Sequence, residues 1–382
     1  MNPDISRWRR TPVAGPSTGP VPGPAPGGAT TAVAVPGRAR FRPAHDRAAI
    51  RTALNAYQAE TGPGAGLYAG DSSGAWTVTA GTGTVDACRP VRSTDHVRIG
   101  GQTKTFTAAV VLQLVDERRV VLDSPVGRYL PGVIDGNGHK GDVITVRQLL
   151  QHTSGAAVQE HPPFPEAGRD GGYTLAALVR AGLSRPPVSA PGGAFQYSHT
   201  NYAILGMLIE RVTGVSAAAA ITGRIIEPLG LTRTAFPAAG DRSVPAPAVQ
   251  GYIGARLGTS FFWTDVLTSV EPSLLGTAGA MISTQRDVTA FYRALLAGGV
   301  VSHAALAEMQ RAIPVGPLTS YGLGLTGFTL SCGATAWGHG GCLAGHLTTT
   351  MVTADGRHAS TVTNAAIDSP KLMHVIDAAL CG

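Results

Sequence analysis

The sequence is poor in charged residues, aromatic residues and cysteines. Of its 382 residues, 14% are charged and 6% are aromatic, and there are four cysteines. Hydrophobic residues nevertheless make up 43%, enough for a large core, so a wholly disordered chain is excluded. No uncharged apolar run reaches the ~20 residues that a membrane-spanning helix needs, so no membrane span is expected. The length fits one large domain or two ordinary ones.

Cysteine and histidine form no metal-site pattern. The cysteines contain no CxxC pair, and the eleven histidines are scattered singly without HExxH. We therefore expect no metal and no other cofactor. The cysteines are Cys88, Cys332, Cys342 and Cys381.

The net charge of +6 is concentrated at the start of the chain. Residues 1–47 hold seven arginines against Asp4 and Asp46, which leaves about +1 for all the rest. No basic face remains in the body, so nucleic-acid binding is not expected. The first segment is also rich in proline and glycine and poor in apolar residues, which predicts a disordered tail over residues 1–43 and a folded domain over 44–382.

The beginning of the sequence bears on localisation. Trp8-Arg9-Arg10 has the arginine pair of an export signal, but proline and glycine follow where such a signal has an apolar stretch. We therefore expect a cytoplasmic protein, with secretion as the alternative. The sequence gives no oligomeric state.

Periodicity predicts strands at both ends of the domain and helices between them. The fold class expected is α/β of the α+β type: an antiparallel sheet built from both termini, flanked by helices, with a helical insertion over about 122–275. Helices are predicted over residues 46–60, 101–117, 149–151, 202–212 and 373–380, and strands over 66–69, 75–80, 347–352 and 359–363. Thr145 and Gln148 form the pattern of a capping box.

One short motif at the start of the buried helix carries chemistry. Lys104 follows Gly101 by three residues, one helical turn, so its amine returns to the side of position 101. A serine at 101 would have a base beside it and a helix N-terminus beneath it, the combination that activates a hydroxyl. Glycine at 101 supplies no hydroxyl.

The segment around Gly101 resembles the block that carries the SxxK motif of the serine β-lactamase and DD-peptidase family, and soluble DD-carboxypeptidase/transpeptidases are the most similar members. The resemblance continues in family order over nearly the whole body. Its segments are residues 97–109, Leu112-Gln113-Leu114-Val115, Tyr129-Leu130-Pro131-Gly132, residues 144–150, Tyr197-Ser198-His199-Thr200-Asn201-Tyr202, Glu227-Pro228-Leu229-Gly230 and Trp337-Gly338-His339-Gly340-Gly341.

The resemblance implies a role for each matching residue. Position 101 is the slot of the acylated serine, Lys104 is its base, and Tyr197 moves protons to and from the leaving group. His339 begins the third motif on the strand that lines the cleft. The backbone amides of Gly101 and Cys342 would form the oxyanion hole. His199, Gly340, Gly341 and Cys342 would contact the substrate. The only partner that the resemblance implies is a small molecule or peptide that carries an acyl group.

The same resemblance implies a disulfide and exposes departures from the family pattern. Leu330-Ser331-Cys332-Gly333 and the C-terminal Cys381 match two cysteines that are bridged in the relatives, so Cys332–Cys381 is the expected pair in an oxidising compartment. The departures are Gly101 for serine, His199 for asparagine, Gly340 for a hydroxyl residue, and Thr326-Gly327 where relatives have an arginine that holds the substrate carboxylate.

Other nucleophiles are weaker candidates. We expect Cys342 to be a neutral, packed strand cysteine and the side chain of Ser198 to point away from the cleft. Thr103 and Thr105 flank Lys104 on the same helix. His199 and His346 are expected to be ordinary hydrogen-bonded residues.

Three functions remain open. The first is a homologue that binds an acyl-amide, acyl-ester or peptide in the family cleft, with covalent catalysis lost or strongly impaired. The second is a hydrolase or transacylase of altered mechanism in small-molecule biosynthesis. The third is an engineered serine-to-glycine form of an active serine hydrolase.

Overall fold

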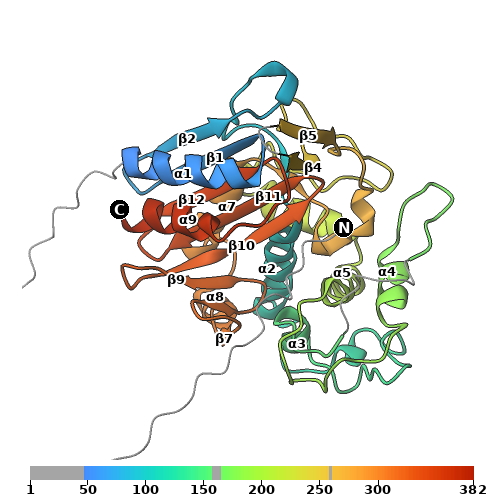
Figure 1. The fold of residues 1–382 in the computed structure, drawn as a ribbon. Helices are drawn as coiled ribbons and strands as arrows, with labels where there is room; N and C mark the ends of the chain where they lie inside the picture. The colour runs from blue at the N-terminus through green and yellow to red at the C-terminus, as the bar shows by residue number, and fades with distance from the viewer. Residues whose placement is uncertain (1–46, 157–164, 258–259) are drawn as a thin grey trace, which may run out of the picture.

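The computed structural model describes residues 47–156, 165–257 and 260–382, so the predicted tail over 1–43 lies outside the described residues. The described chain forms three layers, with a central sheet between two sets of helices (Figure 1). Helices α1 (Arg47–Thr61) and α9 (Lys371–Cys381) cover one face, and α7 (Gln285–Leu296) lies on the other. The expected α/β fold class is confirmed.

The central sheet has eight strands in the order β2-β1-β12-β11-β10-β9-β8-β7, and its neighbours pair antiparallel. The two strands from the start of the domain therefore join six from its end, as the sequence predicts. The strands are β1 (Gly64–Gly70), β2 (Ala75–Gly81), β7 (Ile313–Pro314), β8 (Thr319–Tyr321), β9 (Thr326–Thr329), β10 (Thr335–Leu343), β11 (His346–Thr353) and β12 (His358–Thr363).

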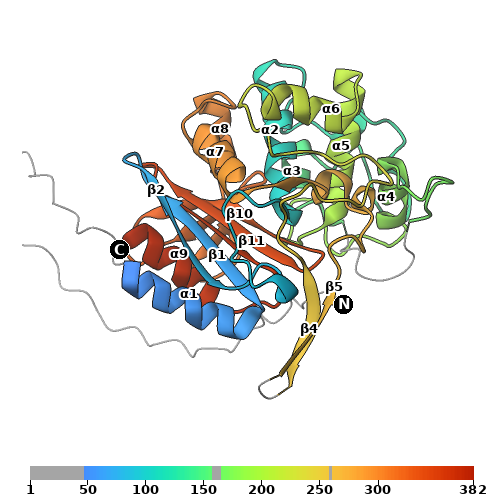
Figure 2. The same cartoon turned by 90° about the horizontal axis from the view of Figure 1, so that it is seen from above.

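Helix α2 (Thr103–Asp116) is the buried centre of the molecule. Most of its residues are fully enclosed, because apolar side chains surround its axis. It packs with α7, with α8 (His303–Met309) and with α5 (His199–Thr213) of the region that lies beyond the sheet edge (Figure 2). The capping box predicted at Thr145 is present: its hydroxyl accepts from the Gln148 amide at the start of α3 (Val146–Leu150).

The region between residues 122 and 275 contains more than helices. It holds α3, α4 (Leu175–Gly182), α5, α6 (Ala217–Ile221) and a π-helical turn (Thr222–Ile226), and also a two-stranded ribbon, β4 (Tyr252–Leu257) and β5 (Ser260–Asp265), that projects from the body (Figure 2). The helices expected in this region are present, and the two-stranded ribbon is an additional element. The aromatic pair Phe262-Trp263 has high β-propensity and favours strand β5. A second short pair joins β3 (Val97–Arg98) to β6 (Ile282–Ser283).

No single helix of the described segments is both long and apolar enough to span a membrane, whereas α5 together with residues 217–226, bent by 79°, passes the same test as a pair.

The C-terminal helix is tied to the turn between β9 and β10 by the predicted disulfide Cys332–Cys381, whose cysteines are 49 residues apart in sequence. Replacing Cys381 with serine should lower the free energy of unfolding by about 2–4 kcal/mol, since the cross-link restricts the unfolded chain. Denaturant melts with and without reductant measure this loss. Thiol titration of the unreduced protein should find only Cys88 and Cys342. Four free thiols, or a reductant-insensitive melt, would contradict the cross-link.

Candidate active site

The site forms where the turn before α2 meets strand β10. An ideal Cβ on Gly341 would lie 1.9 Å from the Ile99 carbonyl oxygen, and one on Gly100 would lie 2.7 Å from the Cys342 amide nitrogen. Only glycine permits so close an approach of two backbones. The approach makes the amides of Gly101 and Cys342 neighbours, as the oxyanion-hole expectation requires.

Gly101 lies in a 3-10 turn, η3 (Gly100–Gln102), that leads directly into α2. The space beside its Cα is occupied. An ideal Cβ there would be 2.9 Å from Tyr197 Oη, 2.9 Å from the Gly340 carbonyl oxygen and 3.3 Å from His339 Cε1. The first two separations are shorter than real Cβ contacts. The surrounding groups therefore pack against a residue without a side chain.

Lys104 points from the first turn of α2 into the same site and is fully buried. Its Nζ lies 2.8 Å from the Ala278 carbonyl oxygen, 3.1 Å from His199 Nδ1 and 4.6 Å from the centre of the Tyr197 ring. Within the described segments no carboxylate forms an ion pair with it. Burial lowers the pKa of Lys104 well below its usual value, which favours the neutral amine.

Tyr197 and His199 flank the N-terminus of α5 and are both partly exposed. Burial raises the pKa of the Tyr197 phenol, so the hydroxyl keeps its proton and can donate it. Burial, and next the charge on Lys104, lower the pKa of His199 well below its ordinary value. The neutral imidazole of His199 can therefore accept a hydrogen bond from Lys104 Nζ at Nδ1.

His339 lies beside Gly101, and both of its ring nitrogens form hydrogen bonds inside the protein. Nδ1 lies 2.5 Å from the Gly340 carbonyl oxygen and Nε2 lies 3.1 Å from Tyr321 Oη. Because a carbonyl only accepts, Nδ1 carries the hydrogen and Nε2 accepts from the phenol. Burial, followed by the Lys104 charge, lowers the pKa of His339 to about 3. The residue at the start of the third motif is thus a neutral, internally bonded imidazole.

The weaker nucleophile candidates are placed as follows. Cys342 is exposed and not packed, because its side chain points away from the buried face shared by His339 and Gly341. The side chain of Ser198 is buried, in agreement with its expected orientation. Thr103 and Thr105 are buried too: the Thr103 hydroxyl accepts from the Met281 amide, and the Thr105 hydroxyl donates to the Gly324 carbonyl.

Two site residues were missed from the sequence. Tyr321 binds His339, and His152 lies with its ring centre 4.5 Å from that of Tyr197. His152 follows the helix predicted over residues 149–151 and has no predicted role in the site. The signal that was available is its place directly after a capped helix, where a residue in left-handed conformation closes the last turn.

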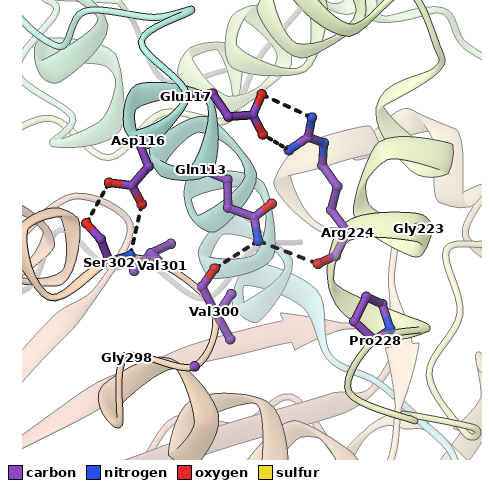
Figure 3. A pocket seen from close by; sticks show the side chains of 11 residues that line it. Gln113, Asp116, Glu117, Gly223, Arg224, Pro228, Gly298, Val300, Val301 and Ser302 are labelled. Carbon is purple, nitrogen blue, oxygen red and sulfur yellow. Dashed lines mark hydrogen bonds and ion pairs between the residues drawn. The ribbon is translucent and has the colours of Figure 1, made fainter.

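A separate pocket of about 600 Å³ lies at the opposite end of α2 (Figure 3). Its polar groups are paired with one another: Asp116 accepts from the Ser302 amide and hydroxyl, and Glu117 from Arg224. Over residues 47–156, 165–257 and 260–382 no group of three or more metal-ligating side chains occurs.

Sequence comparison finds relatives over most of the chain. A family model described as Beta-lactamase matches residues 26–369. Penicillin-binding protein 4 of Amycolatopsis lactamdurans is 33% identical over 260 residues, which are 66% of this chain and 63% of that protein. Protein flp of Staphylococcus aureus (strain N315) is 29% identical over 209 residues, 54% of this chain and 40% of that protein. The chain thus spans less than two thirds of these curated relatives.

Solved structures match more of the chain. A D-stereospecific amidohydrolase from Streptomyces sp. has a TM-score of 0.78 at 40% identity, and the match covers 89% of this chain and 99% of that one. The D-amino acid amidase from Ochrobactrum anthropi SV3, complexed with L-phenylalanine amide, has a TM-score of 0.75 at 25% identity, covering 87% and 97%.

Proposed function

The chain belongs to the beta-lactamase family, and from this premise we propose that it binds an acyl-amide, acyl-ester or peptide at Gly101 without forming the family's covalent acyl-enzyme. The observation that carries the proposal is the filled space beside Gly101, where Tyr197 Oη and the Gly340 carbonyl stand 2.9 Å from the position of a Cβ. We place Gly101 in the slot of the nucleophilic serine. A site packed around glycine has no nucleophile to acylate.

The charge of the site supports a ligand without a carboxylate. His339 is neutral and bonded on both sides, and burial favours the neutral amine of Lys104. Thr326 and Gly327 add no cation where relatives have an arginine. An amide needs no counter-charge, and the adjacent amides of Gly101 and Cys342 offer donors to its carbonyl oxygen. Because two similar structures are D-specific amidases by name, a D-amino acid amide is the first ligand to test.

D-phenylalanine amide should bind the purified protein without being hydrolysed. Titration followed by NMR should show saturable changes at Tyr197 and Lys104, while ammonia release stays at the level of buffer alone. A fluorescent penicillin should leave no adduct in the intact-protein mass spectrum. Titration with L-phenylalanine amide tests whether the site distinguishes the configuration of the ligand. Titration with D-phenylalanine tests whether the site rejects a ligand with a carboxylate. Stoichiometric acylation at any residue, Cys342 and Ser198 included, would refute the non-covalent reading.

One observation favours a hydrolase or transacylase of altered mechanism as second candidate. Lys104 is a buried base that has no counter-ion among the described residues, and it lies next to the phenol of Tyr197 and to the paired backbone amides. These groups could activate a water or an acceptor molecule in place of the serine. Ammonia release from D-phenylalanine amide that Lys104→Met abolishes would establish this mechanism. The engineered-form reading is disfavoured, since Gly340 and His199 also depart from the family pattern.

Localisation is proposed on separate grounds. A cystine such as Cys332–Cys381 persists in oxidising compartments, which favours the secreted alternative over the cytoplasmic expectation. Fractionation of the native host tests this proposal.

A further inference from the structure

His152 holds the peptide groups on both sides of Tyr197. The Gln196 amide donates to the His152 carbonyl oxygen at 2.8 Å, and the Ser198 amide donates to His152 Nδ1 at 3.2 Å. Tyr197 stands between these two bonds. One residue, 45 positions earlier in the chain, thus fixes the backbone immediately before and after the site tyrosine.

The backbone of His152 makes this double contact possible. Its φ is 59°, in the left-handed region, so it ends helix α3 and turns both its carbonyl and its ring toward residues 196–198. Few residues other than glycine, asparagine, aspartate and histidine adopt this conformation at low cost. Glycine would keep the carbonyl contact and lose the ring.

The ring of His152 is fixed in turn by a small polar network. Nδ1 also accepts from Asn201 Nδ2 at 3.1 Å, and Asn201 Oδ1 accepts from the Ser154 hydroxyl at 2.6 Å. A nitrogen that accepts carries no hydrogen, so the neutral ring bears its hydrogen on Nε2. His152 is fully buried, and the rings of Tyr197, Tyr202 and Tyr321 surround it with centres 4.5–5.1 Å away.

We propose that His152 is a positioning residue that sets where the Tyr197 hydroxyl stands beside Gly101. The role rests on the proposed function, because it matters to a ligand only if the ligand binds beside Tyr197 and Gly101. The tolerance is narrow: Tyr197 Oη already lies 2.9 Å from the position of a Cβ on residue 101. A shift of ~0.5 Å in the position of the Tyr197 hydroxyl would already exceed the precision with which the groups of a binding site must be placed.

Two substitutions separate the acceptor of His152 from its bulk. In His152→Asn the amide oxygen replaces Nδ1, and asparagine tolerates the left-handed backbone. In His152→Phe the bulk remains and the acceptor is lost. Amide hydrogen exchange at Ser198 should quicken at least tenfold in His152→Phe and stay within threefold of the parent in His152→Asn. The Gln196 amide, bonded to a backbone oxygen, is the internal reference.

A third variant controls for the loss of any buried histidine. His139 is buried and donates through Nε2 to the Arg185 carbonyl at 2.7 Å. His139→Phe should leave exchange at Ser198 unchanged. If His152→Phe does not fold, imidazole ¹⁵N spectra of the unsubstituted protein still test whether Nδ1 of His152 is an acceptor. These spectra should show unprotonated Nδ1 and protonated Nε2 between pH 6 and 8. A hydrogen on Nδ1 would overturn the proposal, as would equal Ser198 exchange in the asparagine and phenylalanine variants.

Binding of D-phenylalanine amide supplies the functional measurement. His152→Phe should raise the dissociation constant at least tenfold, and His152→Asn should raise it less than threefold. Equal weakening in both variants, or none in His152→Phe, would refute the positioning role. If the unsubstituted protein binds no amide, the proposed function fails alone, and the exchange and ¹⁵N results still test whether His152 fixes Tyr197.

Discussion

Gly101→Ser is expected to acquire acyl-transfer activity that the parent chain lacks. The new hydroxyl would lie at the start of α2 beside Lys104, a buried amine, and Tyr197, a protonated phenol. General-base assistance of this kind contributes roughly 10²–10⁴-fold. With p-nitrophenyl acetate we expect a gain of about 10²-fold or more over the parent and an acetyl adduct on residue 101, measured by nitrophenol release and peptide mass spectrometry.

The structure makes this gain conditional on a small movement. A Cβ at 101 requires Tyr197 Oη and the Gly340 carbonyl to withdraw by several tenths of an ångström. The substitution is therefore less easily accommodated than helix propensity alone suggests, although serine exceeds glycine in that propensity. Gly101→Ala adds the same Cβ without a hydroxyl and is the matched control for this strain. It should destabilise the protein as Gly101→Ser does and remain inactive.

Each other outcome has a distinct meaning. No gain over Gly101→Ala would show that His199 and Gly340 have changed the site beyond family chemistry and would strengthen the binding reading. A parent faster than Gly101→Ser would favour the altered mechanism. Peptides ending in D-Ala-D-Ala should remain poor substrates even of the serine variant, because neither His339 nor Thr326 supplies a cation for their carboxylate.

Acidification is expected to destabilise the protein strongly between pH 6.5 and about 4, before most carboxylates titrate. Burial is the main cause that lowers the pKa of four histidines, of which three are enclosed or nearly enclosed and His199 is partly exposed. These are His346, to about 4, His339, to about 3, and His152 and His199, well below the ordinary value. Each is neutral when folded and takes up a proton more readily when unfolded. Their stabilisation is thus complete above pH 6.5 and is lost as the pH falls through the folded pKa values.

The size of this effect follows from the shift at His346 alone. At ~1.4 kcal/mol for each pKa unit, its protonation costs on the order of 3 kcal/mol. Its neutral ring joins two distant segments: Nδ1 accepts from the Arg98 amide at 3.0 Å, and Nε2 donates to the Val249 carbonyl at 3.0 Å. Urea melts at pH 7.5, 6, 5 and 4.5 measure the loss. His346→Gln, which does not titrate, should flatten the curve between pH 6 and 4.5 relative to the parent. An unfolding free energy independent of pH over this interval would show that these histidines are not buried neutral.

Local patterns in the sequence determined much of the framework. Helical spacing in residues 46–60 predicted α1, the runs at 66–69 and 75–80 predicted strands β1 and β2, and Thr145 with Gln148 predicted a capping box. The spacing of Gly101 and Lys104 placed the amine beside position 101, because one helical turn fixes that relation whatever surrounds it. The family resemblance supplied the pair Cys332–Cys381.

Only the tertiary structure decided the chemical state of the site. His339 loses its ability to act as a cation because burial, followed by the charge on Lys104, lowers its pKa to about 3. His152 gains its relation to Tyr197 because the turn after α3 packs against the start of α5. The space beside Gly101 is filled by groups from two distant segments. A sequence pattern encodes contacts within a few residues. Protonation state, ring orientation and free space depend instead on atoms of distant segments that pack against the residue. Glycine in particular has no side chain from which its surroundings could be inferred.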